Sequence, residues 1–256
     1  MSDVADAVRM EWVRLRTLRS TYVLLGTALC LSGAIAFLFL ANSPGRLDRG
    51  QVVEQLTAGS AHLPLAAILV GVLGVLAVGN DYAFGLARPV LTTVPRRSAL
   101  LAGRLAVLLG AAAVLGLASL ALNAAGLATA LHHGFDAGGT TWRPLAGYVL
   151  QLMLWALLGA GLTLLLRNTT GAVVVLLVVP TIGEAVLAAA LSSERLHALN
   201  PVVRYLPFRA GLALVNPNPL AEDPLALTRV QSGLVFTGFT AAVLALGWTA
   251  YVRRDA

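Results

Sequence analysis

Residues 63–79 read LPLAAILVGVLGVLAVG, a run of seventeen residues without a charged side chain. As a helix it would be about 25 Å long, close to the roughly 30 Å hydrocarbon core of a lipid bilayer. The residues that follow, 80–104, read NDYAFGLARPVLTTVPRRSALLAGR and carry one acid and four arginines. A long apolar run that ends in a short charged connector predicts a transmembrane helix followed by a loop at the membrane surface.

The whole chain has the composition of a membrane protein. Of its 256 residues, 58% are hydrophobic and 12% are charged, whereas a soluble domain has about 25% charged residues. Its mean hydropathy is +0.81. The ~10-residue alternating segments of a transmembrane β-barrel do not occur in the sequence. We therefore predict an all-α polytopic membrane protein in which residues 1–256 form a single transmembrane domain.

Six apolar runs predict six transmembrane helices, at about residues 21–41, 63–79, 99–131, 145–166, 171–191 and 232–252. An even number of spans places both termini on one side, which then holds eleven of the 18 arginines, while the other side holds seven. The positive-inside rule predicts that both termini are cytoplasmic. Every basic residue is arginine and none is lysine, a composition typical of GC-rich bacteria, so we expect a bacterial cytoplasmic membrane.

The N-terminal segment, residues 1–20, predicts an amphipathic helix. Apolar residues recur at spacings of four, four, three and three, which is one helical face: Val4, Val8, Trp12, Leu15 and Leu18. Arg9 and Arg16 lie on the other side of this helix, which would lie in the headgroup plane with Trp12 at the interface. Glu11 falls among the apolar set and weakens the pattern. The segment is either an arginine anchor for the first span or a docking element for a partner.

The connector between the second and third spans predicts a short, interrupted helix. Asn80 and Asp81 are residue types that begin helices, Pro89 favours a break at the residue before it, and Pro95 marks a second corner. Such an element can lie across the membrane surface and contact another protein. The alternative is an ordinary loop with positive-inside arginines.

Three stretches resemble the ABC-2-type permeases of actinobacteria. In the connector, the family's first cytoplasmic loop is matched by Asp81-Tyr82, Gly85, Arg88, Leu91, Pro95-Arg96-Arg97 and Arg104. Residues 11–25, EWVRLRTLRSTYVLL, are similar to the family's approach to the first span. Residues 157–177, LLGAGLTLLLRNTTGAVVVLL, resemble its junction of spans four and five. Asp81 stands where glutamate is common and Arg104 where lysine is common, and both keep the charge.

The resemblance implies a permease subunit that exports a substrate with ATP hydrolysed by a separate ATP-binding subunit. The expected partners are that ATPase, a second permease subunit (the same or a related chain) and membrane lipid, with ATP and Mg²⁺ on the ATPase and no cofactor on this chain. The connector would be a coupling helix that contacts the ATPase through Asp81, Tyr82, Gly85, Arg88, Pro95, Arg96 and Arg97. The N-terminal helix would lie beside it, with Trp12, Arg14 and Arg16 at that interface.

The fifth apolar run contains Pro180, Gly183 and Glu184. Proline removes a backbone hydrogen bond and favours a kink, and a carboxylate at membrane depth is costly unless it faces the bundle, water or an interface. Glu184 is therefore a candidate for the translocation path or a subunit interface, or else it reaches the headgroups at the outer end. The five prolines of residues 192–231 predict a re-entrant or interfacial element, which the resemblance places on the outer side.

Other chemistry finds little support in the sequence. A GxxxxGK[ST] phosphate loop is impossible without lysine, and no catalytic motif occurs, so we expect no enzyme activity in this chain. His132, His133 and Asp136 are read as solvated loop residues, with no metal site expected. The pI near 10.4 reflects loop arginines, so no nucleic-acid partner is expected. Glycines such as Gly116 and Gly159-x-Gly161 predict close helix packing.

Two other classes of function remain open at this point. A polytopic membrane enzyme would need polar groups that converge within the spans, and a non-transporting immunity or assembly component would need none. The sequence does not identify a substrate.

Overall fold

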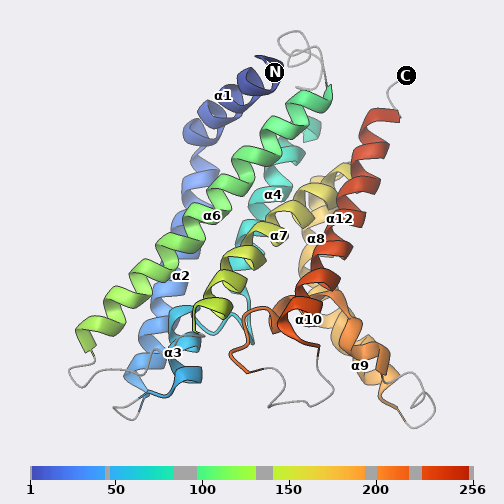
Figure 1. The fold of residues 1–256 in the computed structure, drawn as a ribbon. Helices are drawn as coiled ribbons and strands as arrows, with labels where there is room; N and C mark the ends of the chain where they lie inside the picture. The colour runs from blue at the N-terminus through green and yellow to red at the C-terminus, as the bar shows by residue number, and fades with distance from the viewer. Residues whose placement is uncertain are drawn as a thin grey trace.

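The computed structural model describes residues 2–43, 47–83, 97–130, 141–193, 201–218 and 227–253, in which every regular element is helical (Figure 1). The long helices are α2 (Arg19–Ala41), α4 (Leu65–Ala83), α6 (Arg97–Ala130), α7 (Trp142–Leu166) and α12 (Arg229–Arg253), together with a continuous rod made of α8 (Thr169–Val178), η1 (Val179–Gly183) and α9 (Glu184–Leu191). The short helices are α1 (Ser2–Thr17), α3 (Arg49–Leu56) and α10 (Pro207–Ala213).

Five of these helices are long and apolar enough to cross a membrane: α2, α6, α7, the α8–η1–α9 rod and α12. This confirms an all-α, multi-pass membrane protein. The apolar part of α4, Leu65–Asn80, is shorter, so a sixth crossing there stays a prediction. In Figure 1 the beginning of α1 and the end of α12 lie at one end of the bundle, and α3 and α10 lie toward the other.

Helix α7 occupies the centre of the bundle. Of its apolar window 61% is buried, against 17% for α2 and for α12. It packs between α4 and α12, which are its main neighbours. Trp155, Tyr148 and Leu152 of α7 are almost completely enclosed. The outer helices expose many large apolar side chains, as lipid-facing helices do.

Glycines let the central helices approach closely, as their spacing predicts. A Cβ atom at Gly159 of α7 would overlap the carbonyl oxygen of Gly71 of α4. A Cβ atom at Gly74 would likewise overlap the carbonyl oxygen of Ala156. Without a strong hydrophobic force between helices in lipid, such close backbone packing is a main source of association.

A two-residue turn reverses the chain between α7 and α8. Arg167 ends α7 with a left-handed backbone, φ 52°, and its N–H reaches the carbonyl oxygen of Thr163 at 2.8 Å. Asn168 then begins α8, because its Oδ1 accepts a hydrogen bond from the N–H of Gly171 at 2.9 Å. A left-handed residue at a helix end and an asparagine cap at the next beginning are the usual means of making such a turn.

Residues 201–218, part of the predicted re-entrant element, insert a short helix into the bundle. A 3₁₀ turn at 201–205 leads into α10. The ring of Phe208 packs among those of Trp155, Phe236 and Phe239, with centroids 5.5, 6.1 and 5.8 Å away. Trp155 lies thirteen residues into α7, which is about 20 Å along that helix, so α10 reaches well into the bundle.

Candidate functional site

The first candidate site lies where α1 crosses the beginning of α6. Ala7 of α1 is fully buried, and a Cβ atom at Gly103 would lie 2.7 Å from its Cβ atom. The missing side chain at Gly103 therefore lets the two backbones come together. One turn further along α1, at position 11, the contact becomes ionic.

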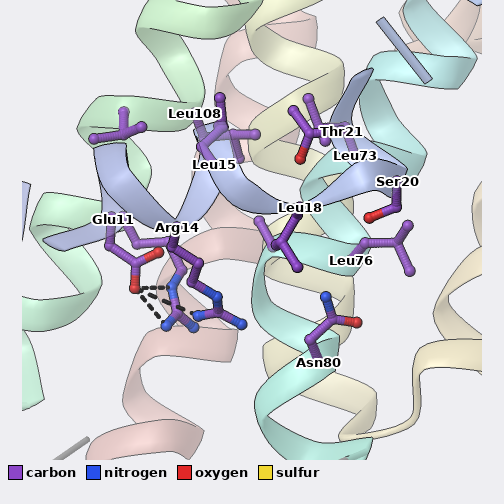
Figure 2. Close-up of a pocket in the computed structure, with 13 residues that line it drawn as sticks. Glu11, Arg14, Leu15, Leu18, Ser20, Thr21, Leu73, Leu76, Asn80 and Leu108 are labelled. Atoms are coloured by element: carbon purple, nitrogen blue, oxygen red, sulfur yellow. Dashed lines mark hydrogen bonds and ion pairs between the residues drawn. The ribbon is translucent and has the colours of Figure 1, made fainter. Parts of the chain in front are cut away.

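Glu11 and Arg104 form a buried ion pair across this contact. The Nε and Nη2 atoms of Arg104 donate to Oε1 of Glu11 at 2.9 and 2.6 Å, and both side chains are about 93% buried. Arg14 approaches the same oxygen at 3.5 Å, and Figure 2 shows Arg14 beside Glu11 on the same face of α1. Removing one partner of a buried ion pair costs several kcal/mol, about 3–5.

The ion pair lies next to the end of α4. A small cavity of ≈ 30 Å³ separates Glu11 and Arg104 from Asn80, Leu76 and Leu73 of α4, and Figure 2 shows Asn80 across this space from Arg14. A volume of this size holds about one water molecule. Asn80 immediately precedes Asp81, where the predicted coupling loop begins. The beginning of α6, the end of α4 and α1 thus meet at the base of that loop.

Most of the predicted loop contacts lie outside the described residues. Gly85, Arg88, Pro95 and Arg96 are not described. Asp81 and Tyr82 lie in the last turn of α4, and Arg97 begins α6, but the side chains of these three are likewise not described. The structure therefore places the two ends of the loop and leaves its contacts as predictions.

The face of α1 that packs against the protein carries Ala7 and Glu11, and Trp12 lies outside it. Trp12 is 49% exposed and Val4 is also exposed, whereas Ala7 and Glu11 are buried. The guanidinium of Arg16 lies 5.8 Å from the ring centre of Trp12 on the outer face. Glu11 interrupts the apolar pattern of α1 and lies on its buried face, because its partner Arg104 is on another helix.

Glu184, the second candidate, holds the beginning of α10. Its carboxylate is 7% exposed and accepts two backbone hydrogen bonds, from the N–H of Phe208 to Oε1 at 2.9 Å and from the N–H of Arg209 to Oε2 at 2.8 Å. The first N–H groups of a helix lack partners within it, and α10 has no capping side chain of its own. Glu184 supplies that cap from another helix. The partners of Glu184 are backbone N–H groups, which the sequence did not indicate.

Pro180 accounts for the local geometry around Glu184. Proline has no N–H to donate, and residues Val179–Gly183 form a π-helical turn. The N–H of Glu184 consequently donates to the carbonyl oxygen of Val179, five residues earlier. A π-turn contains one extra residue and changes which face the following side chains occupy. The predicted distortion at Pro180 thus takes the form of a π-turn, and Glu184 is the first residue after it.

An open cavity of ≈ 300 Å³ borders Glu184. It is lined by side chains of the α8–η1–α9 rod, by Arg209 and Leu212 of α10, by Trp155 and by His62. His62 also lies 3.2 Å from Glu54. Among the described residues, no group of three or more histidine, cysteine, aspartate or glutamate side chains lies close enough to hold a metal ion.

Two polar side chains within predicted spans have structural roles that the sequence analysis does not anticipate. Gln151 of α7 donates through Nε2 to the carbonyl oxygen of Gly211 at 3.1 Å, which fixes the end of α10. Asn123 of α6 donates through Nδ2 to Oγ of Ser32 at 3.1 Å and to the carbonyl oxygen of Leu56 at 2.9 Å. A carboxamide inside an apolar run was the signal available for both.

Comparison with protein-family models finds no family that matches the chain, and comparison with curated proteins finds no similar sequence. The likeness to ABC-2-type permeases therefore rests on the three stretches of sequence in which it was found.

Proposed function

We propose that the chain is the transmembrane permease subunit of an ABC-2-type exporter in a bacterial cytoplasmic membrane. ATP would be hydrolysed by a separate subunit docked on the loop between α4 and α6, and a second permease subunit would complete the pathway. The substrate is left open.

The observation that carries the proposal is the Glu11–Arg104 pair. Force applied to a docking loop moves a substrate only if the loop is coupled to the spans. Helix α4 leads into the loop and α6 leads out of it, and the ion pair fastens α1 to α6 through Arg104, the residue that follows Gly103. A displacement of the loop would therefore move α1, α4 and α6 as one unit.

Glu184 supports a matching role at the opposite end of the bundle. In the proposed mechanism α10 is part of the exit, and two hydrogen bonds to the carboxylate of Glu184 hold it to the α8–η1–α9 rod. Hydrogen bonds to a charged group are worth about 1.5–3 kcal/mol. Opening of the exit would require these two bonds to break, together with the packing of Phe208 and the bond from Gln151 to Gly211.

The test is co-isolation of the tagged chain from its native membranes. With wild-type protein we expect a second chain that carries a GxxxxGK[ST] motif and hydrolyses ATP. Asp81→Arg and Tyr82→Ala should lower its recovery several-fold while leaving the yield and unfolding temperature of the permease unchanged. Tyr205→Ala is the matched control, because Tyr205 is 48% exposed and lies next to α10. Absence of any ATPase from the wild-type sample would overturn the proposal.

A further inference from the structure

An amphipathic groove opens at the end of the bundle where α7 and α12 begin. It is formed by residues 142–150 of α7, by 214–218 after α10 and by 228–237 at the beginning of α12, and it encloses ≈ 890 Å³. We call it the α7–α12 groove. Its volume lies within the range of ~300–1,000 Å³ that is usual for small-molecule sites.

The charged part of the groove is at its mouth. Arg143 lies in the first turn of α7 and Arg229 is the first residue of α12, and no acidic residue lines the groove among the residues described there. The two guanidinium groups are close enough to act on each other electrostatically. Each also lies at the positive end of a helix dipole, where a cation is disfavoured and an anion is stabilised. The positive charges of two guanidinium groups and the positive ends of two helix dipoles therefore meet at the mouth.

The apolar part of the groove extends away from the mouth along both helices. Ala146 and Leu150 follow Arg143 along α7, and Leu234 follows Arg229 along α12. Leu150 lies seven residues after Arg143, which is about 10 Å along the helix. Trp142 is exposed at the mouth, at a level where tryptophan is enriched in membrane proteins. The groove is thus cationic at the membrane boundary and apolar toward the hydrocarbon.

We infer that the α7–α12 groove binds a phospholipid. Arg143 and Arg229 would contact the lipid's phosphodiester, and the part of an acyl chain nearest the headgroup would lie against Ala146, Leu150 and Leu234. The charge favours an anionic headgroup over a zwitterionic one. A free anion would use the mouth alone and leave the apolar walls uncovered, and an uncharged apolar ligand would leave the positive charges unneutralised. The inference requires a membrane-spanning chain and does not depend on the proposed transport function.

Arg143 and Arg229 have different secondary roles, and this decides the choice of variants. Arg229 donates through Nη2 to the carbonyl oxygen of Asn216 at 2.7 Å, so its removal would also loosen the chain after α10. Arg143 is exposed and lies over the ring of Trp142 at 5.8 Å. Arg143→Gln therefore removes charge with little effect on the fold. Ala146→Trp fills the apolar part and leaves both arginines in place.

The experiment is native mass spectrometry of the full chain with phosphatidylglycerol, phosphatidylcholine or inorganic phosphate added. We expect one tightly held phosphatidylglycerol, at least about 10-fold weaker binding in Arg143→Gln, since a hydrogen bond to a charged group is lost, and a comparable loss in Ala146→Trp. Arg209→Gln, an exposed arginine on α10, should bind as wild type does. An unfolding temperature equal to that of wild type shows that each variant is folded.

Three results would overturn the inference. Equal lipid retention by Arg143→Gln and Arg209→Gln would show that the arginines at the mouth do not bind the headgroup. Undiminished binding by Ala146→Trp would show that no acyl chain enters the groove. Displacement of the lipid by millimolar inorganic phosphate would make the mouth a free-anion site.

Discussion

Arg104 lies 93 residues after Glu11 in the sequence, and yet its Nε and Nη2 atoms both donate to one oxygen of Glu11, at 2.9 and 2.6 Å. This pair fastens the N-terminal helix to the beginning of α6, beside the end of α4. Whatever acts on the loop between α4 and α6 consequently acts on α1 as well.

Removing Glu11 alone should destabilise the protein more than removing both partners. Glu11→Leu removes the carboxylate that pairs with the buried guanidinium of Arg104, and we expect a loss of about 3–5 kcal/mol in the free energy of unfolding. The double variant Glu11→Leu/Arg104→Met replaces the pair by apolar side chains and should recover most of that loss. Thermal unfolding in detergent measures both. Glu54→Leu is the control: it removes a more exposed carboxylate, the partner of His62, and should change the free energy of unfolding by less than about 1 kcal/mol. Equal losses in the single and double variants would show that Glu11 and Arg104 do not stabilise the protein as a pair.

Replacing Glu184 should loosen α10. In Glu184→Gln the amide keeps one acceptor oxygen but turns an NH₂ group toward a backbone N–H, so one of the two capping bonds is lost. We expect amide hydrogen exchange at Phe208 and Arg209 to accelerate about 10-fold or more, because a charge-assisted bond is worth about 1.5–3 kcal/mol. Thr181→Val is the control, since the hydroxyl of Thr181 donates within its own rod, to the carbonyl oxygen of Leu177 at 2.5 Å. Unchanged protection of α10 in Glu184→Gln would show that the cap does not hold it.

The same glycine-to-alanine change should have opposite effects at two positions. Gly159→Ala places a methyl group against the carbonyl oxygen of Gly71, and overpacking of this kind costs about 1–3 kcal/mol or more. Nothing lies within 4 Å of a Cβ atom at Gly110, so Gly110→Ala should gain up to about 1 kcal/mol from helix propensity. Unfolding temperatures of the two variants give the comparison. Similar temperatures would mean that α4 and α7 are not in close backbone contact.

Sidedness can be tested with single cysteines. Cys30 is the one native cysteine, so Cys30→Ser provides the background. Thr92→Cys should react with a membrane-impermeant maleimide only after the cells are permeabilised, and Asn218→Cys should react in intact cells. Both expectations follow from the arginine distribution. The reverse labelling pattern would place the loop between α4 and α6 outside the cell and exclude an ATPase docked on it.

Hydropathy was sufficient to predict the helical, multi-pass fold because burial in lipid imposes long uncharged runs on the sequence. The break at Arg167 and Asn168 was also visible, because these two polar residues separate the fourth and fifth apolar runs and asparagine commonly begins helices. Contacts between segments that are distant in the sequence could not be predicted in this way. Glu11 has no local signal for its partner on α6, so its position on α1 looked like a defect in an amphipathic pattern.

Glu184 shows the same limit in another form. Pro180 predicted a distortion and the carboxylate predicted a special environment, but the direction of the side chain depends on a π-turn, which adds a residue to the helix. Its partner is the backbone of α10, and backbone groups leave no trace in residue types. Gln151 and Asn123 are carboxamides inside apolar runs, and the sequence does not indicate where their contacts are made.

The most direct measurement is site-specific photo-crosslinking in native cells, with a photoreactive phenylalanine at Tyr82 and, for comparison, at Tyr205. If the loop between α4 and α6 is the docking site of an ATP-binding subunit, position 82 will capture a chain with a GxxxxGK[ST] motif and position 205 will not. If position 82 captures no such chain, or both positions capture it equally, the loop is not where ATP-driven force enters this protein.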